Sequence, residues 1–185
     1  MSQLKNLAFL DVETTGFAYK SRDRIVEIGI VKTDLDGNIV GEFETLINPE
    51  RDVGPTHIHG VTAEMVAGAP LFNKVAHLLL DFLDDTLWIA HNASFDLNFL
   101  LSEFARAGNE LDTPPHLCTL ANSRQLLPEL PNHKLETICS YFDIPLLQAH
   151  AALEDARATQ GVFSQLHATN SSLLDGYLSA FRCQR

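Results

Sequence analysis

Residues 7–16 read LAFLDVETTG, an apolar run that ends in two acidic residues and a glycine. An apolar run of this length predicts a buried strand. Side chains two positions apart project from the same face of a strand, so Asp11 and Glu13 should point together beyond its carboxyl end. Two carboxylates held side by side predict a site that binds cations.

The segments that follow predict an antiparallel meander. Residues 24–33 are rich in Ile and Val, residues 34–38 have the composition of a turn, and residues 39–47 alternate as a strand does. Further along, we expect helices after Thr62 and over residues 70–84, 97–105, 119–127 and 134–142, with short strands at 87–90 and 117–119. A meander followed by alternating strands and helices indicates an α/β domain with a mixed sheet.

Two later segments add acidic residues and a histidine near predicted element boundaries. Asp96 falls at a junction between a strand and a helix. A long helix is expected after Pro145, with His150 in the segment that leads into it and Asp155 in its first turns. Taken singly, each residue could be an ordinary acid at an element end or a surface histidine.

Three motifs, DVETTG at 11–16, HNASFD at 91–96 and HAALED at 150–155, resemble those of the DEDDh, or DnaQ-like, 3′ to 5′ exonuclease family, which includes the proofreading epsilon subunit of DNA polymerase III. The resemblance spans about residues 5–168. It implies a ribonuclease H-like fold, with a five-stranded mixed sheet flanked by helices. It also implies two divalent metal ions, Mg²⁺ or Mn²⁺, held by Asp11, Glu13, Asp96 and Asp155.

The chemistry of phosphodiester hydrolysis suits these residue types. Hard divalent ions prefer oxygen ligands, and two such ions can activate the attacking water and stabilise the departing 3′ oxygen. An imidazole exchanges protons near neutral pH, so we interpret His150 as the general base that accepts the proton of the water.

The resemblance also implies a pocket for the terminal nucleotide. Thr14, Thr15 and Gly16 would hold it through their backbone, since glycine permits close approach, and Phe17 and Phe95 would stack on bases of any identity. IHGVT at 58–62 is similar to a substrate-pocket segment of the family. We expect His59 and Ile58 to contribute there, on an extended segment, and His57 to face solvent.

Composition predicts one exonuclease domain over residues 1–185, with a last helix at 171–185. A chain of 185 residues with 45% hydrophobic content can bury a substantial core. Neither a signal peptide nor a membrane span is apparent, which predicts a cytoplasmic protein. The three cysteines lack a metal or dithiol spacing and are expected to be reduced.

The net charge of −11 is unusual for a protein that binds nucleic acid, but bound divalent ions would reverse the local potential. Lys20, Arg22 and Arg24 form a basic loop that could meet a phosphate backbone. We therefore expect a metal-dependent 3′ to 5′ exonuclease that releases nucleoside 5′-monophosphates from single-stranded or frayed ends, with DNA favoured. The resemblance leaves open an exoribonuclease of the oligoribonuclease or ribonuclease T type. A free-standing enzyme is favoured over a subunit of DNA polymerase III, and a non-catalytic nucleic-acid-binding domain is the alternative of a different class.

Overall fold

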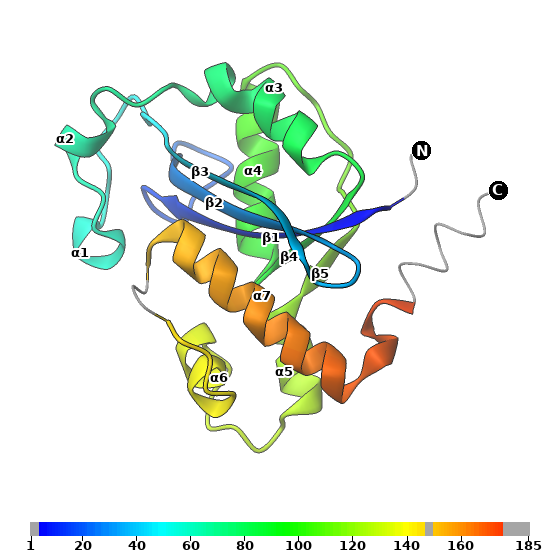
Figure 1. Cartoon of the computed structure of the whole chain (residues 1–185). Helices are drawn as coiled ribbons and strands as arrows, with labels where there is room; N and C mark the ends of the chain where they lie inside the picture. The colour runs from blue at the N-terminus through cyan, green and yellow to red at the C-terminus, as the bar shows by residue number, and fades with distance from the viewer. Residues whose placement is uncertain (1–3, 147–149, 176–185) are drawn as a thin grey trace.

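The computed structural model describes residues 4–146 and 150–175. Its centre is a five-stranded sheet with the order β3-β2-β1-β4-β5 (Figure 1). β1 (Asn6–Thr14), β2 (Ile25–Asp34) and β3 (Ile39–Leu46) form the predicted antiparallel meander. β1 is thus central, with β2 on one side and β4 on the other.

The second half of the sheet is parallel. β4 (Thr86–Ala90) pairs with β1 and β5 (His116–Cys118) pairs with β4, both in parallel. The predicted mixed sheet is therefore confirmed. The strand order reverses between β1 and β4, and ligands of open α/β sheets commonly bind beyond the carboxyl ends of strands at such a reversal.

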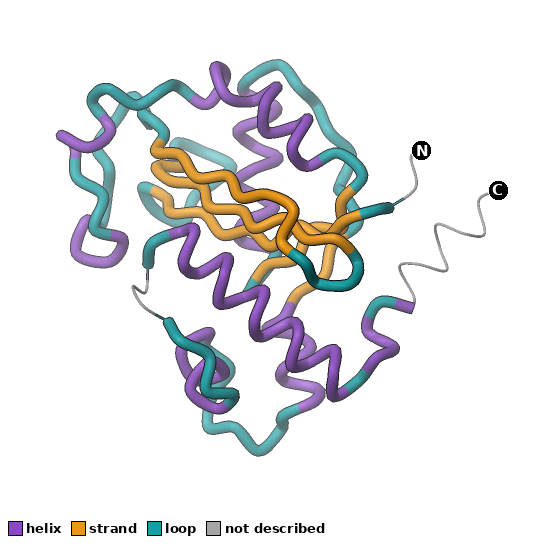
Figure 2. The backbone as a smooth tube through the Cα atoms, viewed as in Figure 1, coloured by secondary structure: helices purple, strands orange, loops and turns teal. Residues whose placement is uncertain are grey.

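Helices cover both faces of the sheet (Figures 1 and 2). α3 (Phe72–Leu83) and α4 (Ser94–Arg106) pack on one face, and α7 (Ala152–Thr169) packs on the other. α5 (Thr119–Leu126) and α6 (Leu135–Tyr141) pack against α7 through a separate apolar cluster. No helix among the described residues is long and apolar enough to cross a bilayer.

The alternation of β1 divides its side chains between the two layers. Leu10 and Val12 belong to the apolar cluster of α3 and α4, whereas Leu7 and Phe9 belong to that of α7. Because side chains alternate, the odd-numbered Asp11 and Glu13 continue the α7 face past the end of the apolar part. The sequence prediction that they share one face is consistent with this arrangement.

Two predictions about local structure need correction. Residues 56–59, expected to be extended, form the one-turn helix α1 (Thr56–His59), which ends at Gly60 with φ of 73°. Left-handed glycine is a common helix stop. Thr62 caps α2 (Ala63–Val66), as expected, by accepting a hydrogen bond from the Met65 N–H.

At the C-terminal end, residues 171–173 form a 3₁₀ turn, η1 (Ser171–Leu173), rather than the start of a continuous helix. The rest of the helix predicted over 171–185 falls largely on residues 176–185, which lie outside the described residues. Cys118 and Cys139 are free thiols, as expected, and Cys183 also lies outside the described part.

Candidate active site

The carboxyl end of β1 extends beyond its parallel partner. Pairing between β1 and β4 ends at Phe9 and Ile89, whereas pairing between β1 and β2 continues to Thr14. The Val12 N–H therefore faces a gap, where it donates a hydrogen bond of 3.1 Å to Oδ1 of Asp96. Asp96 lies in the first turn of α4, at the predicted junction, and is only 2% exposed.

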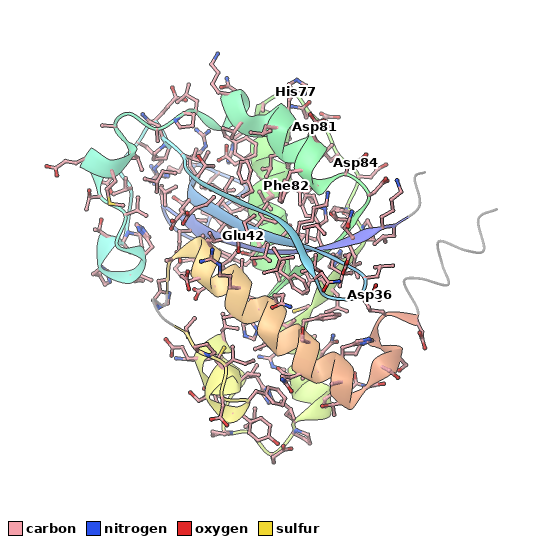
Figure 3. The ribbon with its side chains drawn as sticks, in the orientation of Figure 1. Asp36, Glu42, His77, Asp81, Phe82 and Asp84 are labelled. Carbon is pink, nitrogen blue, oxygen red and sulfur yellow. The ribbon has the colours of Figure 1, made fainter. Side chains whose placement is uncertain are left out.

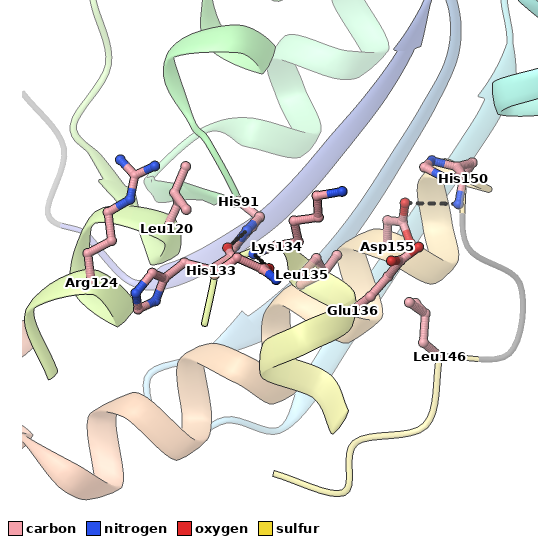
Figure 4. A pocket seen from close by; sticks show the side chains of 11 residues that line it. His91, Leu120, Arg124, His133, Lys134, Leu135, Glu136, Leu146, His150 and Asp155 are labelled. Carbon is pink, nitrogen blue, oxygen red and sulfur yellow. Dashed lines mark hydrogen bonds between the residues drawn. The ribbon is translucent and has the colours of Figure 1, made fainter. Parts of the chain in front are cut away.

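His150 and Asp155 reach the same edge from the start of α7. The His150 N–H donates a hydrogen bond of 3.1 Å to Oδ2 of Asp155 (Figure 4). Oδ1 of Asp155 is buried and has no hydrogen-bond partner among the described residues. Glu13, His150 and Asp155 each offer one ligand atom, and these atoms lie within 4.8 Å of one another. Two segments distant in sequence, the end of β1 and the start of α7, thus converge on one point.

Two residues that the sequence analysis did not single out position α7 on the sheet. A Cβ atom on Gly29 of β2 would lie 2.1 Å from the backbone nitrogen of Leu153, so only glycine permits this approach. Oε2 of Glu27 accepts a hydrogen bond of 3.4 Å from the Ala152 N–H. Glu27 also pairs in register with Glu13. The one signal in the sequence was an acidic residue inside an Ile- and Val-rich strand.

The acids of the cluster destabilise one another's charged forms. Burial raises the pKa of Asp11 well above its usual range, and the charges of Asp96 and Asp155 raise it further. Burial raises the pKa of Glu13 to about 9, with Asp11 and Asp155 adding to the effect. Burial is also the main cause of the raised pKa of Asp96 and of Asp155.

This set of donors fits a divalent cation. The oxygens of Asp11, Glu13, Asp96 and Asp155 are hard ligands, and a buried oxygen of Asp155 is without a partner among the described residues. A bound divalent cation would neutralise these carboxylates, which otherwise repel one another. Of the residues predicted from the sequence, Glu13, His150 and Asp155 are brought together as possible metal ligands, and Asp11 and Asp96 lie near enough to interact with these acids through their charges.

Two aromatic residues adjoin the segments that carry these acids: Phe17 follows β1, and Phe95 precedes Asp96 in α4. Phe17 is 81% exposed, and its ring meets that of Phe95 with centroids 6.1 Å apart. Phe95 in turn packs on Phe99, whose ring is 5.0 Å away in the α4 layer. Such an exposed apolar side chain, supported from behind, can stack on a base.

The loop that carries Phe17 is fastened to α4. Arg24 donates hydrogen bonds of 2.6 and 2.9 Å to the two carboxylate oxygens of Glu103, which is 1% exposed. Arg106 pairs with the same carboxylate and donates a hydrogen bond of 2.7 Å to the Tyr19 carbonyl. Of the predicted basic loop, Arg24 is thus paired with Glu103.

Gly16 follows Thr14 and Thr15 at a position where a larger residue would collide with the side chain of Asp23. A Cβ atom on Gly16 would lie 2.4 Å from Oδ2 of Asp23, a carboxylate that accepts hydrogen bonds from the Ala18 N–H and the Thr15 hydroxyl. Thr14 bonds within the same turn, through its hydroxyl to the Gly16 carbonyl. The turn is therefore ordered before any nucleotide binds.

His59 orders a neighbouring loop. Its Nδ1 accepts a hydrogen bond of 3.1 Å from the Val61 N–H, so its Nε2 carries the proton and donates to the Val53 carbonyl at 3.2 Å. With both nitrogens engaged, His59 can shape a pocket but has no free donor for a ligand. Ile58 beside it is 44% exposed, and His57 is exposed as expected.

A family model described as exonuclease (RNase T) matches residues 8–163. The chain belongs to this exonuclease family. Its ribonuclease H-like fold and DnaQ-like motifs, predicted from the sequence, are thereby confirmed, as is its class as an exonuclease.

The exonuclease domain is similar to PolC-type DNA polymerase III from two bacteria. Identity is 38% over 158 residues with the protein of Caldanaerobacter subterraneus, covering 84% of this chain and 11% of the relative. It is 44% over 154 residues with that of Oceanobacillus iheyensis, covering 80% and 10%. The chain therefore spans about a tenth of the length of these relatives.

Solved structures show the same architecture. Exonuclease X in complex with 5′ overhanging duplex DNA superposes with a TM-score of 0.71 at 26% identity, covering 89% of this chain and 93% of that one. E. coli exonuclease I in complex with a dT13 oligonucleotide has a TM-score of 0.81 at 20% identity, covering 92% and 43%. The second match shows the fold alone.

Proposed function

We propose that this exonuclease domain removes nucleoside 5′-monophosphates one at a time from the 3′ end of single-stranded or frayed nucleic acid, DNA in preference to RNA. The observation that carries the proposal is the buried carboxylate cluster beside the exposed Phe17. Two comparisons support DNA as the substrate in this proposal. The similar bacterial proteins are DNA polymerases, and exonuclease X, at 26% identity, was solved in complex with DNA.

Asp11, Glu13, Asp96 and Asp155 would hold two divalent ions, Mg²⁺ or Mn²⁺. When bound, such ions supply positive charge to the attacking water and to the departing 3′ oxygen. His150 is exposed beside the cluster, and its ring forms no hydrogen bond with the other described residues. The His150 N–H is bonded to Asp155, which keeps this residue beside the cluster and supports the proposal that its imidazole takes the proton of the water.

The turn after β1 would hold the terminal nucleotide. Phe17 and Phe95 present ring surfaces on which a base can stack, and this stacking is the same for all four bases. Thr14, Thr15 and Gly16 lie between Glu13 and Phe17 in the sequence. In this proposal, Ile58 and His59 of α1 complete the pocket. A terminal base must leave its duplex partner to enter, which favours unpaired ends.

The partners proposed are 3′ ends and the DNA polymerase III assembly. The matched segment forms part of PolC-type polymerase chains, which supports an association with that assembly in the cytoplasm. A free-standing enzyme over residues 1–185 is the alternative. Size-exclusion chromatography with and without the polymerase subunit separates the two.

Degradation of matched single-stranded DNA and RNA, labelled at either end, tests the activity. A 3′ label should leave as a mononucleotide in the first turnover, while a 5′ label should give a ladder that shortens by single steps.

Asp155→Asn should abolish turnover in a folded protein, and His150→Ala should lower the rate by about 10²–10⁴ while metal binding persists. Asp81→Asn, an exposed acid on α3, is the matched control. Full activity in excess EDTA, or cleavage of a circular strand, would refute the proposal.

A further inference from the structure

A cleft adjoins the metal cluster on the α5–α6 side of the sheet. Its volume is about 530 Å³, within the range of about 300–1,000 Å³ typical of ligand sites. His150 and Asp155 line one end, Arg124 lines the other, and Lys134 lies between them (Figure 4). The cleft is therefore continuous with the place where a phosphodiester would be cut.

A half-buried histidine, His91, holds the wall of this cleft in place. Nε2 of His91 contacts the His133 carbonyl at 2.9 Å, and because a carbonyl only accepts, Nε2 carries the proton. Nδ1 then accepts from the Thr119 hydroxyl at 3.0 Å. Burial lowers the pKa of His91, which keeps the ring neutral as this pairing requires. His91 thus ties the loop before α6 to the end of β4.

The loop also fixes the backbone of Lys134. Oδ1 of Asn132 accepts hydrogen bonds from the Lys134 N–H at 3.0 Å and from the Thr137 hydroxyl at 2.7 Å. Lys134 immediately precedes α6, and Arg124 lies in the last turn of α5. Two cationic side chains are thereby presented to the cleft from ordered backbone.

Neither cation forms a salt bridge within the described part of the chain, and the acids that line the same cleft are Glu136 and Asp155. Most other described arginines pair with acids, whereas the side chains of Arg124 and Lys134 form no salt bridge there. Several of the acidic residues behind the negative net charge lie away from the cleft. Asp81 is on α3, Asp84 follows that helix, and Asp36 is in the turn between β2 and β3 (Figure 3). In a chain with a net charge of −11, unpaired cations beside the metal cluster favour an anionic ligand.

The cleft and the aromatic pair flank the carboxylates from different layers. Phe17 and Phe95 adjoin the α4 layer, while the cleft is built by α5, α6 and the start of α7. In the proposed reaction, a strand whose last base stacks on Phe17 has its scissile phosphate at the carboxylates, and the cleft in the other layer offers a path for its remaining nucleotides. Resting on the proposed function, we infer that Arg124 and Lys134 bind backbone phosphates of the strand on the 5′ side of the scissile bond.

Two substrates separate phosphate binding in the cleft from the chemistry. A dT12 oligonucleotide reaches the cleft, whereas the p-nitrophenyl ester of thymidine 5′-monophosphate offers a scissile phosphate with no upstream strand. Arg124→Ala and Lys134→Ala should each lower the ratio of kcat/KM for dT12 to that for the ester by about tenfold, as removal of a charged hydrogen bond implies. The dependence of log kcat/KM on log salt should become shallower by about 0.7 for each phosphate that the variant no longer binds.

Lys74→Ala is the matched control, because Lys74 is an exposed lysine of α3 without a salt bridge to the other described residues. It should leave both the ratio and the salt dependence unchanged. An equal fall for both substrates, or an unchanged ratio in the Arg124 and Lys134 variants, would overturn the inference.

Binding supplies a readout that does not depend on turnover. Fluorescence anisotropy with labelled dT12 and the Asp155→Asn protein should show Kd rising about tenfold when Arg124→Ala or Lys134→Ala is added. An unchanged Kd overturns the role of the cleft. If the parent enzyme hydrolyses neither substrate, the proposed function fails, while the anisotropy result still decides whether the cleft binds a strand.

Discussion

Glu13 shows how single side chains of the site depend on pH. Burial, followed by the charges of Asp11 and Asp155, raises its pKa to about 9 in the folded protein without metal. A carboxyl group with a higher pKa in the folded state binds its proton more tightly there. Its favourable contribution is complete below its unfolded pKa, near 4.5, and is lost as the pH rises toward 9. The metal-free protein should therefore lose stability across this window.

Glu13→Gln should remove most of that loss, because the amide stays uncharged. In EDTA at pH 8 we expect its melting temperature to exceed that of the parent by roughly 2–4 °C for each kcal/mol of repulsion relieved, with no difference at pH 4. Scanning calorimetry at both values gives the measurement. Glu110→Gln, on an exposed loop, should change neither. A variant that melts below the parent at pH 8 would contradict the repulsion inferred for Glu13.

The sequence predicts some of these residues and misses others for a physical reason. Asp11 and Glu13 follow from strand alternation, and Asp96, His150 and Asp155 follow from motif resemblance. Glu27, Gly29 and His91 have roles set by partners far along the chain: Ala152, Leu153 and His133. Nothing in their local sequence contexts indicates those partners.

At the scale of elements, the packing of α7 on β2 places half of the site. Because a Cβ atom on Gly29 would meet the Leu153 backbone at 2.1 Å, Gly29→Ala must move the start of α7 away from the sheet. A displacement of about 1 Å can cost about 10²-fold in rate, and overpacking costs about 1–3 kcal/mol. We expect kcat/KM to fall by about 10² or more, with a lower melting temperature.

Gly68→Ala is the comparison for this variant, since a Cβ atom there meets no atom within 4 Å. It should retain parental activity and stability. Parental kcat/KM in Gly29→Ala would show that the position of α7 is less restricted than the packing indicates.

The elements that the sequence predicted are those in which many apolar residues recur at the spacing of a helix or a strand. The meander, α3, α4 and α7 all lie close to their predicted ranges. The prediction for α1 was wrong because four residues carry no periodic signal, and its turn depends on Gly60 and on the hydrogen bonds of His59. Hydrophobic periodicity alone does not predict short elements that are held by such local interactions.

Across the whole molecule, the site joins layers that otherwise pack separately. Asp96 comes from α4 on one face and Asp155 from α7 on the other, with Asp11 and Glu13 on β1 between them. Bound divalent ions would link both layers. At a metal concentration of about 100 Kd, binding should stabilise the fold by about 2.7 kcal/mol, or roughly 5–10 °C in melting temperature.

Calorimetry with Mg²⁺, Mn²⁺ and EDTA measures this shift. Asp155→Asn should lose most of it, whereas the exposed control Asp81→Asn should keep it. An equal shift in Asp155→Asn would place the stabilising ion elsewhere.

The clamp of Arg24, Glu103 and Arg106 has a consequence for the choice of substrate. It fastens the loop of Phe17 to α4, so the backbone that carries the exposed ring resists displacement by a base that is still paired. In the proposed reaction, the rate then follows how often an end opens by itself. The protein would sense the local melting of its substrate, and a mismatched end would be removed sooner because it opens more often, whichever base it carries.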